Sequence, residues 1–243
     1  MRKLSMIKIS VLILIIFLIT NFTQGMWITC FAYTNKLKDN KFIIEKNIKE
    51  NNKCIEINVS YPQLVPNSLK LINNEIKGWT DDWINDVKGI LNDYKKAGYI
   101  CNMQYQLISQ FFITLEKESL MSFYIDYYQF TGGAHGITTR NAYTVDIEKG
   151  EKLKIKDLFK KGYDYKLFID KEINREIDLN KDKYFEGSEG FNGINDDVKF
   201  FIRGDNLVIY YGQYEIAPYA SGIPEFNIPI QKFDGNFIYD KIK

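Results

Sequence analysis

The only histidine of this chain is the first residue to consider as a catalytic group. His135 lies in the stretch TGGAHG, residues 131–136, directly after Gly132 and Gly133. A histidine acts as a general base only where a nucleophile or a bound substrate offers it a proton. The sequence has no Gly-x-Ser-x-Gly motif that would supply a serine nucleophile. The residue types therefore predict no catalytic residue at this turn.

Metal and phosphate chemistry are also disfavoured. A catalytic zinc ion needs three protein ligands, usually including two or more histidines, and the three cysteines show no Cys-x-x-Cys spacing. A phosphate-binding loop joins a strand to a helix, so that helix amides meet the anion. Here the glycines join two runs that both have the pattern of strands. We expect no metal ion and no other cofactor.

Carboxylates leave one catalytic alternative open. Two acidic side chains that flank a glycosidic bond can hydrolyse it, and spacing along the sequence cannot exclude such a pair. The candidates are Asp126, Asp146, Glu215 and Glu225. An acidic residue on a protein surface is usually just solvated. A carboxylate-dependent hydrolase is therefore the alternative rather than the first hypothesis.

The elements that position these residues begin after residue 32. Basic Arg2, Lys3 and Lys8 precede the apolar run 11–19, as in a secretory signal peptide. The sequence favours cleavage after Ala32 and leaves open an uncleaved anchor or, third, a lipid on Cys30. Without residues 1–32, 29 basic and 31 acidic side chains remain, so nucleic acid is not an expected partner. A membrane contact would run only through an uncleaved N-terminal segment.

Two cysteines then remain, Cys54 and Cys101. An even pair in an exported chain is consistent with a disulfide. Two separate buried cysteines are an equally good interpretation of the sequence.

Hydrophobic periodicity predicts an α+β fold, with antiparallel sheets packed against a long helix in two closely associated subdomains, residues 41–147 and 148–235. Residues 54–61 alternate as a half-buried strand, and several strands follow between residues 99 and 147. Asn67 is the expected N-cap and Gly98 the expected end of the long helix. Its predicted core-facing stripe is Ile72, Ile76, Trp79, Trp83, Val87, Ile90 and Tyr94. In the second part we expect a short helical turn, a helix over 163–177 and a hairpin that turns at residues 204–206.

Three motifs resemble a known pair of domains: the TGGAHG turn, the K-x-x-D-L-F turn at residues 154–159, and the ending YEIAPYASGIPEF at residues 214–226. The resemblance covers about residues 41–233. It is to the ectodomain of RsiV-type anti-sigma factors and to the N-terminal region of PdaC-type peptidoglycan deacetylases. It implies an α+β fold for each half and a position outside the cytoplasmic membrane, either secreted or tethered. In RsiV-type proteins the ectodomain looks like a lysozyme receptor, so the resemblance implies a related binding role.

Two departures from the resemblance shape the functional expectation. Only the six residues MRKLSM precede the hydrophobic segment that starts at Ile7, so we expect no cytoplasmic part that could hold a sigma factor, and we expect no deacetylase domain in this chain. The prediction is a non-enzymatic binding or sensing module of the bacterial cell envelope. Its ligand would be a cell-wall glycan or a muramidase such as lysozyme. The hydrolase alternative would act on wall polymers.

The expected contact region combines the glycine turn with the aromatic ending. The glycines supply positive φ angles, and His135 would first hold the turn's shape and second touch a ligand. Tyr214, Glu215, Pro218 and Tyr219 form the other half of the region. Exposed tyrosine rings stack on sugars and act as hot spots for protein partners. A purely structural corner is an equally good interpretation of residues 217–222.

Overall fold

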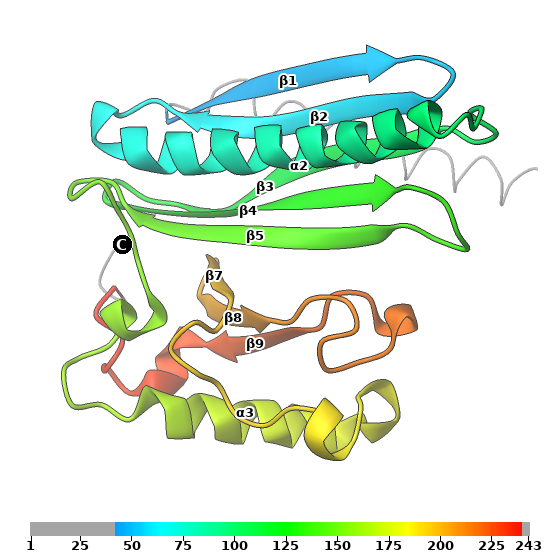
Figure 1. Ribbon diagram of the computed structural model, residues 1–243. Coiled ribbons are helices and arrows are strands. Elements are labelled where there is room, and N and C mark those ends of the chain that lie inside the picture. The colour runs from blue at the N-terminus through cyan, green and yellow to red at the C-terminus, as the bar shows by residue number, and fades with distance from the viewer. Residues whose placement is uncertain (1–41, 240–243) are drawn as a thin grey trace, which may run out of the picture. The chain divides into compact units, whose positions relative to one another are not determined.

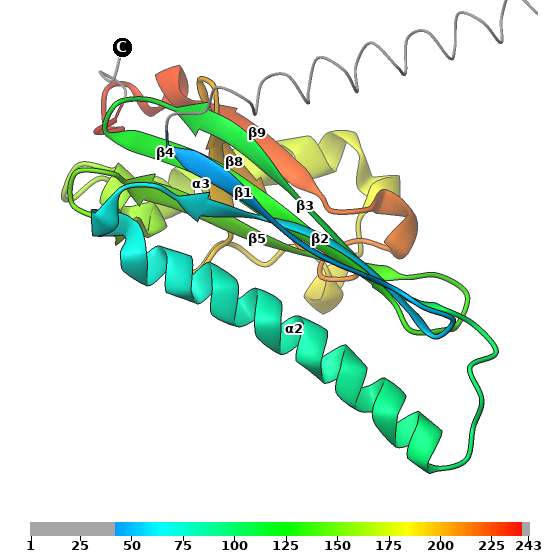
Figure 2. The same cartoon turned by 90° about the horizontal axis from the view of Figure 1, so that it is seen from above.

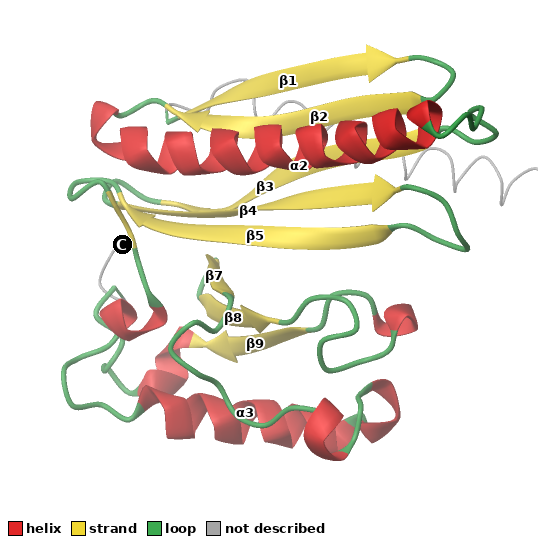
Figure 3. Cartoon of the chain, in the orientation of Figure 1, coloured by secondary structure: helices red, strands yellow, loops and turns green. Residues whose placement is uncertain are grey.

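A computed structural model describes residues 42–239. These residues form two sheets and two α-helices, and Figures 1 and 3 show one helix in front of the first sheet, with the second sheet and the other helix below them. The first sheet contains β1 (Ile43–Asn51), β2 (Ile55–Leu64), β3 (Tyr105–Glu116), β4 (Leu120–Phe130), β5 (Ile137–Asp146) and β6 (Glu151–Lys152), in that order. The second contains β7 (Phe200–Arg203), β8 (Asn206–Tyr210) and β9 (Glu225–Pro229). The α+β prediction is confirmed.

One strand pair departs from the predicted antiparallel pattern. β2 and β3 run parallel, with Ile55 opposite Tyr105, whereas β3, β4 and β5 form an antiparallel meander. The reason is α2 (Lys70–Lys96), which carries the chain back along the sheet before β3 begins (Figure 2). Parallel neighbours need such a crossover, while antiparallel ones can be joined by a short turn.

Helix α2 buries a different stripe from the one that we predicted. Its buried residues include Ile72, Ile76 and Val87 of the predicted set, but Trp79 is 44% exposed. The other buried positions of the helix are Thr80, Ile84 and Leu91. Each of them follows directly after a residue of the predicted stripe. The Thr80 hydroxyl can take this place because it donates to the Ile76 carbonyl at 2.8 Å and meets the buried Tyr127 hydroxyl at 2.9 Å.

The ends of α2 are also instructive. Asn67 does not cap the helix through its side chain; it begins a 3-10 turn, Asn67–Leu69, that leads into α2. Gly98 ends the helix as predicted, with φ +85° and its N–H bonded to the Lys95 carbonyl at 3.0 Å. Within residues 42–239, no helix is both long and apolar enough to cross a bilayer. The signal-peptide prediction falls outside the described residues.

The second sheet has a helix on one face and the first sheet on the other. Helix α3 (Tyr165–Leu179) begins at Asp164, whose carboxylate accepts the Leu167 N–H, and buries Ile169 and Ile173. On the opposite face, Phe201 and Tyr210 pack against Tyr124 of β4. The predicted turn at residues 204–206 lies between β7 and β8, and the predicted helical turn is the 3-10 segment Ile155–Leu158.

Candidate functional site

The glycine turn joins β4 to β5 and adopts the backbone that we predicted from its sequence. Gly132 has φ +109° and Gly133 φ +94°, angles at which a side chain would be strained. Gly136 lies against Tyr128, and a Cβ atom there would stand 2.4 Å from the tyrosine ring. The close approach of backbone to ring therefore favours a glycine at this position.

His135 is exposed at this turn. Its Nδ1 lies 3.0 Å from the carbonyl oxygen of Gly136, which agrees with the expected contact to a backbone group. The ring is therefore oriented by the turn itself, and its other nitrogen, Nε2, is directed away from that carbonyl.

The second half of the site is the loop between β8 and β9. Tyr214 is 50% exposed and has φ +66°, one of two positive φ angles outside glycine in the described residues. A backbone in this region costs of order 1 kcal/mol or more and persists only where the surroundings enforce it. The Glu215 carboxylate helps to enforce it, because it accepts the Gly212 N–H at 2.7 Å and pairs with Lys199 at 2.6 Å.

Pro218 precedes a short 3-10 segment, Tyr219–Ser221, that ends at Gly222 with φ +68°. The Ser221 hydroxyl donates to the Lys183 carbonyl at 2.9 Å, which ties this segment to the chain after α3. Pro218 and Glu215 thus shape the loop backbone, and the two tyrosines present the rings.

The glycine turn and the aromatic loop meet through three rings, which we call the aromatic cluster: His135, Tyr214 and Tyr219. The His135 ring stacks on Tyr219 with centroids 3.8 Å apart and planes 20° apart. Tyr214 lies 5.7 Å from Tyr219 by centroid, and its hydroxyl is 3.3 Å from His135 Nε2. Residues separated by about eighty positions in the sequence therefore form one partly exposed surface.

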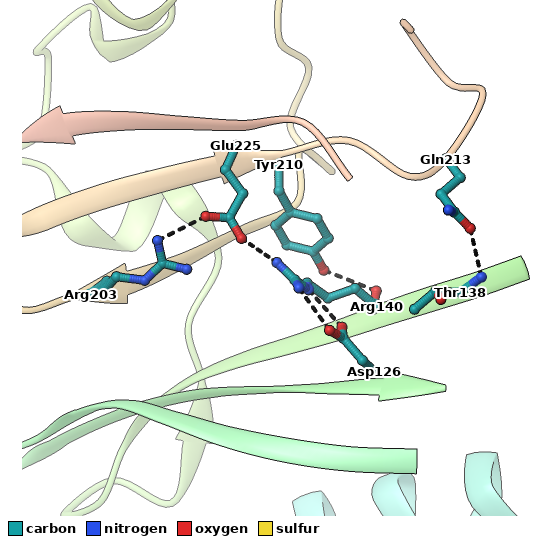
Figure 4. A network of polar contacts seen from close by, with 7 residues as sticks. All are labelled: Asp126, Thr138, Arg140, Arg203, Tyr210, Gln213 and Glu225. Carbon is teal, nitrogen blue, oxygen red and sulfur yellow. Dashed lines mark hydrogen bonds and ion pairs between the residues drawn. The ribbon is translucent and has the colours of Figure 1, made fainter. Parts of the chain in front are cut away.

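An arginine that the sequence analysis did not single out lies beneath this region. Arg140 of β5 makes two hydrogen bonds to Asp126, at 2.7 and 2.8 Å, and a third to Glu225 of β9 (Figure 4). Its guanidinium lies 3.8 Å from the centre of the Tyr124 ring, and its side chain is only 9% exposed. Arg140 thus joins the two sheets. The only sequence signal is a basic residue inside a run of strand-forming residues.

The basic and acidic side chains of this network are paired with one another. Burial alone would lower the pKa of Arg140, but its hydrogen bonds to Asp126 and the nearby negative charges outweigh burial and raise it. Burial would likewise raise the pKa of Glu225, yet hydrogen bonds from Arg203 and Arg140 hold it below its ordinary value. Arg140 and Glu225 are therefore both charged at neutral pH.

The four carboxylates named for the hydrolase alternative do not form a free pair. Asp126 and Glu225 both bind Arg140, and Glu215 binds Lys199. Asp146 accepts the Lys149 N–H at 2.9 Å and the Tyr239 hydroxyl at 3.2 Å. Each of the four carboxylates therefore has a structural partner within the described residues. Residues 42–239 also hold no group of three side chains suited to a metal ion.

The structure resolves the alternatives for the cysteines. Cys54 and Cys101 form a disulfide with Cα atoms 5.3 Å apart. Cys54 lies just before β2 and Cys101 just after α2, so the bond closes the crossover between the two parallel strands.

Comparison with known proteins identifies two domains in this chain. The family model described as deacetylase PdaC matches residues 48–138, and that of a protein family of unknown function, DUF3298, matches residues 156–231. The first part of the chain is therefore similar to the PdaC family and the second part to the DUF3298 family, in the order that the resemblance to PdaC-type proteins implied.

One curated relative is the peptidoglycan-N-acetylmuramic acid deacetylase PdaC of Bacillus subtilis (strain 168), which is 30% identical over 109 residues. The match covers 43% of this chain and only 23% of the relative. A DUF3298 protein of Bacteroides fragilis has a crystal structure similar to this one, with a TM-score of 0.56 and 22% identity over 80% of this chain and 93% of that chain. A second, from Pseudomonas aeruginosa PAO1, has a TM-score of 0.54 and 17% identity, covering 83% of this chain and 96% of that one. These structures support the fold.

Proposed function

We propose that this protein is a non-catalytic binding or sensing module of the bacterial cell envelope. Its contact surface is the aromatic cluster, and its ligand is a wall glycan or a muramidase such as lysozyme. The observation that carries the proposal is the stacking of His135, Tyr214 and Tyr219 into one partly exposed surface on two braced loops.

The geometry supports binding because the rings are held in place before a ligand arrives. Tyr214 is fixed by an enforced positive φ angle, and Tyr219 by its stack on His135. A rigid aromatic surface loses little conformational freedom on association, which favours affinity. Tyrosine offers an apolar ring with a hydroxyl at its edge, and this combination suits both sugar faces and protein hot spots.

The domain content supports the cell-envelope setting. A PdaC domain and a DUF3298 domain indicate a cell-wall-associated protein family. The relative from Bacillus subtilis is, by its name, a deacetylase of peptidoglycan N-acetylmuramic acid. We propose that this chain acts outside the cytoplasmic membrane, secreted or tethered through residues 1–32.

Direct binding assays test the proposal. The full-length chain, purified in a mild non-ionic detergent, is sedimented with purified peptidoglycan and passed over immobilised hen lysozyme. We expect retention by at least one of them, weakened tenfold or more by Tyr219→Ala and by Tyr214→Ala. Leu179→Ala serves as the control, because Leu179, at the end of α3, is 75% exposed and lies outside the aromatic cluster. Retention by neither material, or equal retention of all variants, would overturn the proposal.

The hydrolase alternative is tested with the same material. Purified wall is incubated with the chain, and reducing sugar and turbidity are followed. We expect no release. Release that Glu215→Gln abolishes, with the fold intact by circular dichroism, would replace the binding proposal by a carboxylate-dependent hydrolase.

The role of His135 is tested by two substitutions. His135→Gln keeps one hydrogen bond to the turn and should change stability little, while His135→Ala removes both the bond and the stack on Tyr219. Because the ring is exposed, we expect His135→Ala to cost about 1 kcal/mol at most, by chemical denaturation. Ligand retention should fall further in the alanine variant than in the glutamine variant.

A further inference from the structure

A groove of about 620 Å³ runs along the edge of β5 and shares no residue with the aromatic cluster. Residues 140–144 of β5 form one side of it. Residues 152–155 and 196–200 form two walls, and Trp79 of α2 lies at its rim. Sites for small ligands usually have volumes of about 300–1,000 Å³.

The groove exists because β5 has a partly open edge. β4 pairs with β5 along its whole length, whereas β6 pairs with it only at Val145 and Asp146. Backbone groups of successive strand residues point to opposite edges. The Thr144 carbonyl accepts the Leu153 N–H, so the even-numbered residues of β5 direct their backbone groups away from β4 and toward the groove.

Part of this edge is already satisfied. The Thr138 N–H donates to Gln213 Oε1 at 2.7 Å, and the Arg140 carbonyl accepts the Tyr210 hydroxyl at 3.1 Å. These contacts protect an edge that would otherwise pair with other strands.

Two further backbone groups of this edge lie beside the groove, at Ala142 and Thr144. Within residues 42–239, neither the Ala142 carbonyl nor the Thr144 N–H has a hydrogen-bond partner. Thr144 is only 2% exposed, and backbone groups at that depth almost always have a partner. A ligand group that donates to the Ala142 carbonyl and accepts from the Thr144 N–H would satisfy both.

These two groups suit one residue of an extended peptide. They stand two residues apart on the same edge, as a carbonyl and an N–H that both face the groove. The N–H and carbonyl of a single extended residue also lie on one side, so that residue can bind both, as in strand addition to a sheet edge. The N–H and carbonyl of an isolated acetamido group point in opposite directions. Such a group can satisfy only one of the two.

The walls of the groove suit the side chains of such a peptide. Trp79 presents an exposed ring, and its Nε1 lies 3.0 Å from the Asn141 amide oxygen when that amide is turned toward it. Lys154 and Asp197 line the groove without an ion pair in the described part of the chain. They offer one charge of each sign, which matches a peptide that carries both signs.

We propose that the β5 groove binds a short extended peptide that pairs with Ala142 and Thr144 and packs a side chain on Trp79. Residues 140–144 span about 13 Å at 3.3 Å per residue, so three or four ligand residues fit. This site is independent of the aromatic cluster, and either can fail without the other.

The test uses the full-length chain and a bead library of random acetylated hexapeptides. Enriched sequences are resynthesised, and their affinities are measured by calorimetry. We expect tenfold weaker binding with Trp79→Ala and at least threefold weaker binding with Lys154→Glu. Methylation of one peptide nitrogen should weaken binding tenfold or more, at a single position. Ile90→Ala is the matched control, because Ile90 is an exposed residue of the same helix.

Three results would overturn the proposal. They are no enriched peptide, affinities unchanged by both groove variants, or affinities unaffected by methylation at any nitrogen. Oligomers of N-acetylglucosamine are titrated in parallel. If they bind and lose affinity with Trp79→Ala while no peptide does, the groove is a saccharide site and the peptide assignment is wrong.

Discussion

Replacement of Arg140 by methionine should destabilise the protein more than any other single change of a charged residue discussed above. The substitution removes three hydrogen bonds, two to Asp126 and one to Glu225, and leaves both carboxylates between the two sheets. Methionine keeps an apolar contact with Tyr124, so the main loss is electrostatic. Glu225 keeps its bond to Arg203 at 2.8 Å.

The expected magnitude follows from burial. Breaking a buried ion pair by removing one partner costs about 3–5 kcal/mol. Asp126 and Glu225 are 23% and 22% exposed, so water reaches both and the lower end of that range applies. We expect a loss of about 3 kcal/mol at pH 7, or roughly 6–12 °C in Tm for a chain of this size.

The pH dependence of this loss gives a second, sharper expectation. In the native protein the pKa of Glu225 is lowered, so its contribution to stability is present above the unfolded pKa and disappears as pH falls through the folded pKa. In Arg140→Met, Glu225 has lost one of the two arginines that lower its pKa, and protonation relieves the charge that this leaves without its partner. The penalty should therefore shrink by about 1 kcal/mol or more between pH 7 and pH 4.

Urea unfolding followed by circular dichroism at both pH values measures these quantities. Arg203→Met is the matched control, because Arg203 is 41% exposed and pairs with Glu225 alone. It should cost at most about 1 kcal/mol. A loss below 1 kcal/mol in Arg140→Met, or an equal loss at the two pH values, would refute the assignment of Arg140 as the electrostatic link between the sheets.

Three further outcomes are expected. The double replacement of Cys54 and Cys101 by serine should lower the free energy of unfolding by about 2–4 kcal/mol, measured by urea titration, because the disulfide closes a separation of 47 residues. Gly150→Ala should lower the free energy of unfolding by more than about 2 kcal/mol, since the new Cβ atom would lie 2.5 Å from a backbone oxygen. Gly133→Ala has open space around the new Cβ atom and should cost about 1 kcal/mol, as thermal melts of the two variants would show. A lysine and an arginine lower the pKa of Glu172 despite its burial, so the wild type should lose stability below about pH 4.5. Glu172→Gln should lose less stability over the same pH range, as acid titrations at fixed urea would show.

Local patterns in the sequence were enough to predict most individual elements. The alternation of residues 54–61 became β2, and the turn at 204–206 joined β7 to β8, because turn chemistry and period-two burial are properties of neighbouring residues. The end of α2 at Gly98 follows from the same kind of local signal.

Features that depend on distant residues could not be predicted in this way. The parallel pairing of β2 with β3 is set by where α2 returns the chain, and the exposure of Trp79 by which of two apolar tracks on α2 meets the sheet. Thr80 competes for the core only because Tyr127, 47 positions away, offers its hydroxyl a partner. The cysteine pairing was undecidable for the same reason.

In the candidate site, too, local features could be predicted and contacts between distant residues could not. His135 and Tyr219 could be named from their residue types, but their contact requires the β8–β9 loop to lie against the β4–β5 turn. Arg140 was missed because its partners Asp126 and Glu225 lie 14 and 85 positions away, and no local pattern distinguishes a buried arginine from a solvated one.

One edge of the sheet explains how the distant parts of the site are held together. β8 ends at Tyr210, whose hydroxyl binds the Arg140 carbonyl, and three residues later Gln213 binds the Thr138 N–H (Figure 4). These two contacts fasten the start of the loop to β5, and the next residue is the strained Tyr214. The polar groups that satisfy the edge of β5 therefore also position the aromatic cluster. In the other direction along β5, at Ala142 and Thr144, the same edge borders the groove. A single strand thus supports two surfaces with different chemistry, one aromatic and completed by this chain, the other a backbone groove that suits a ligand.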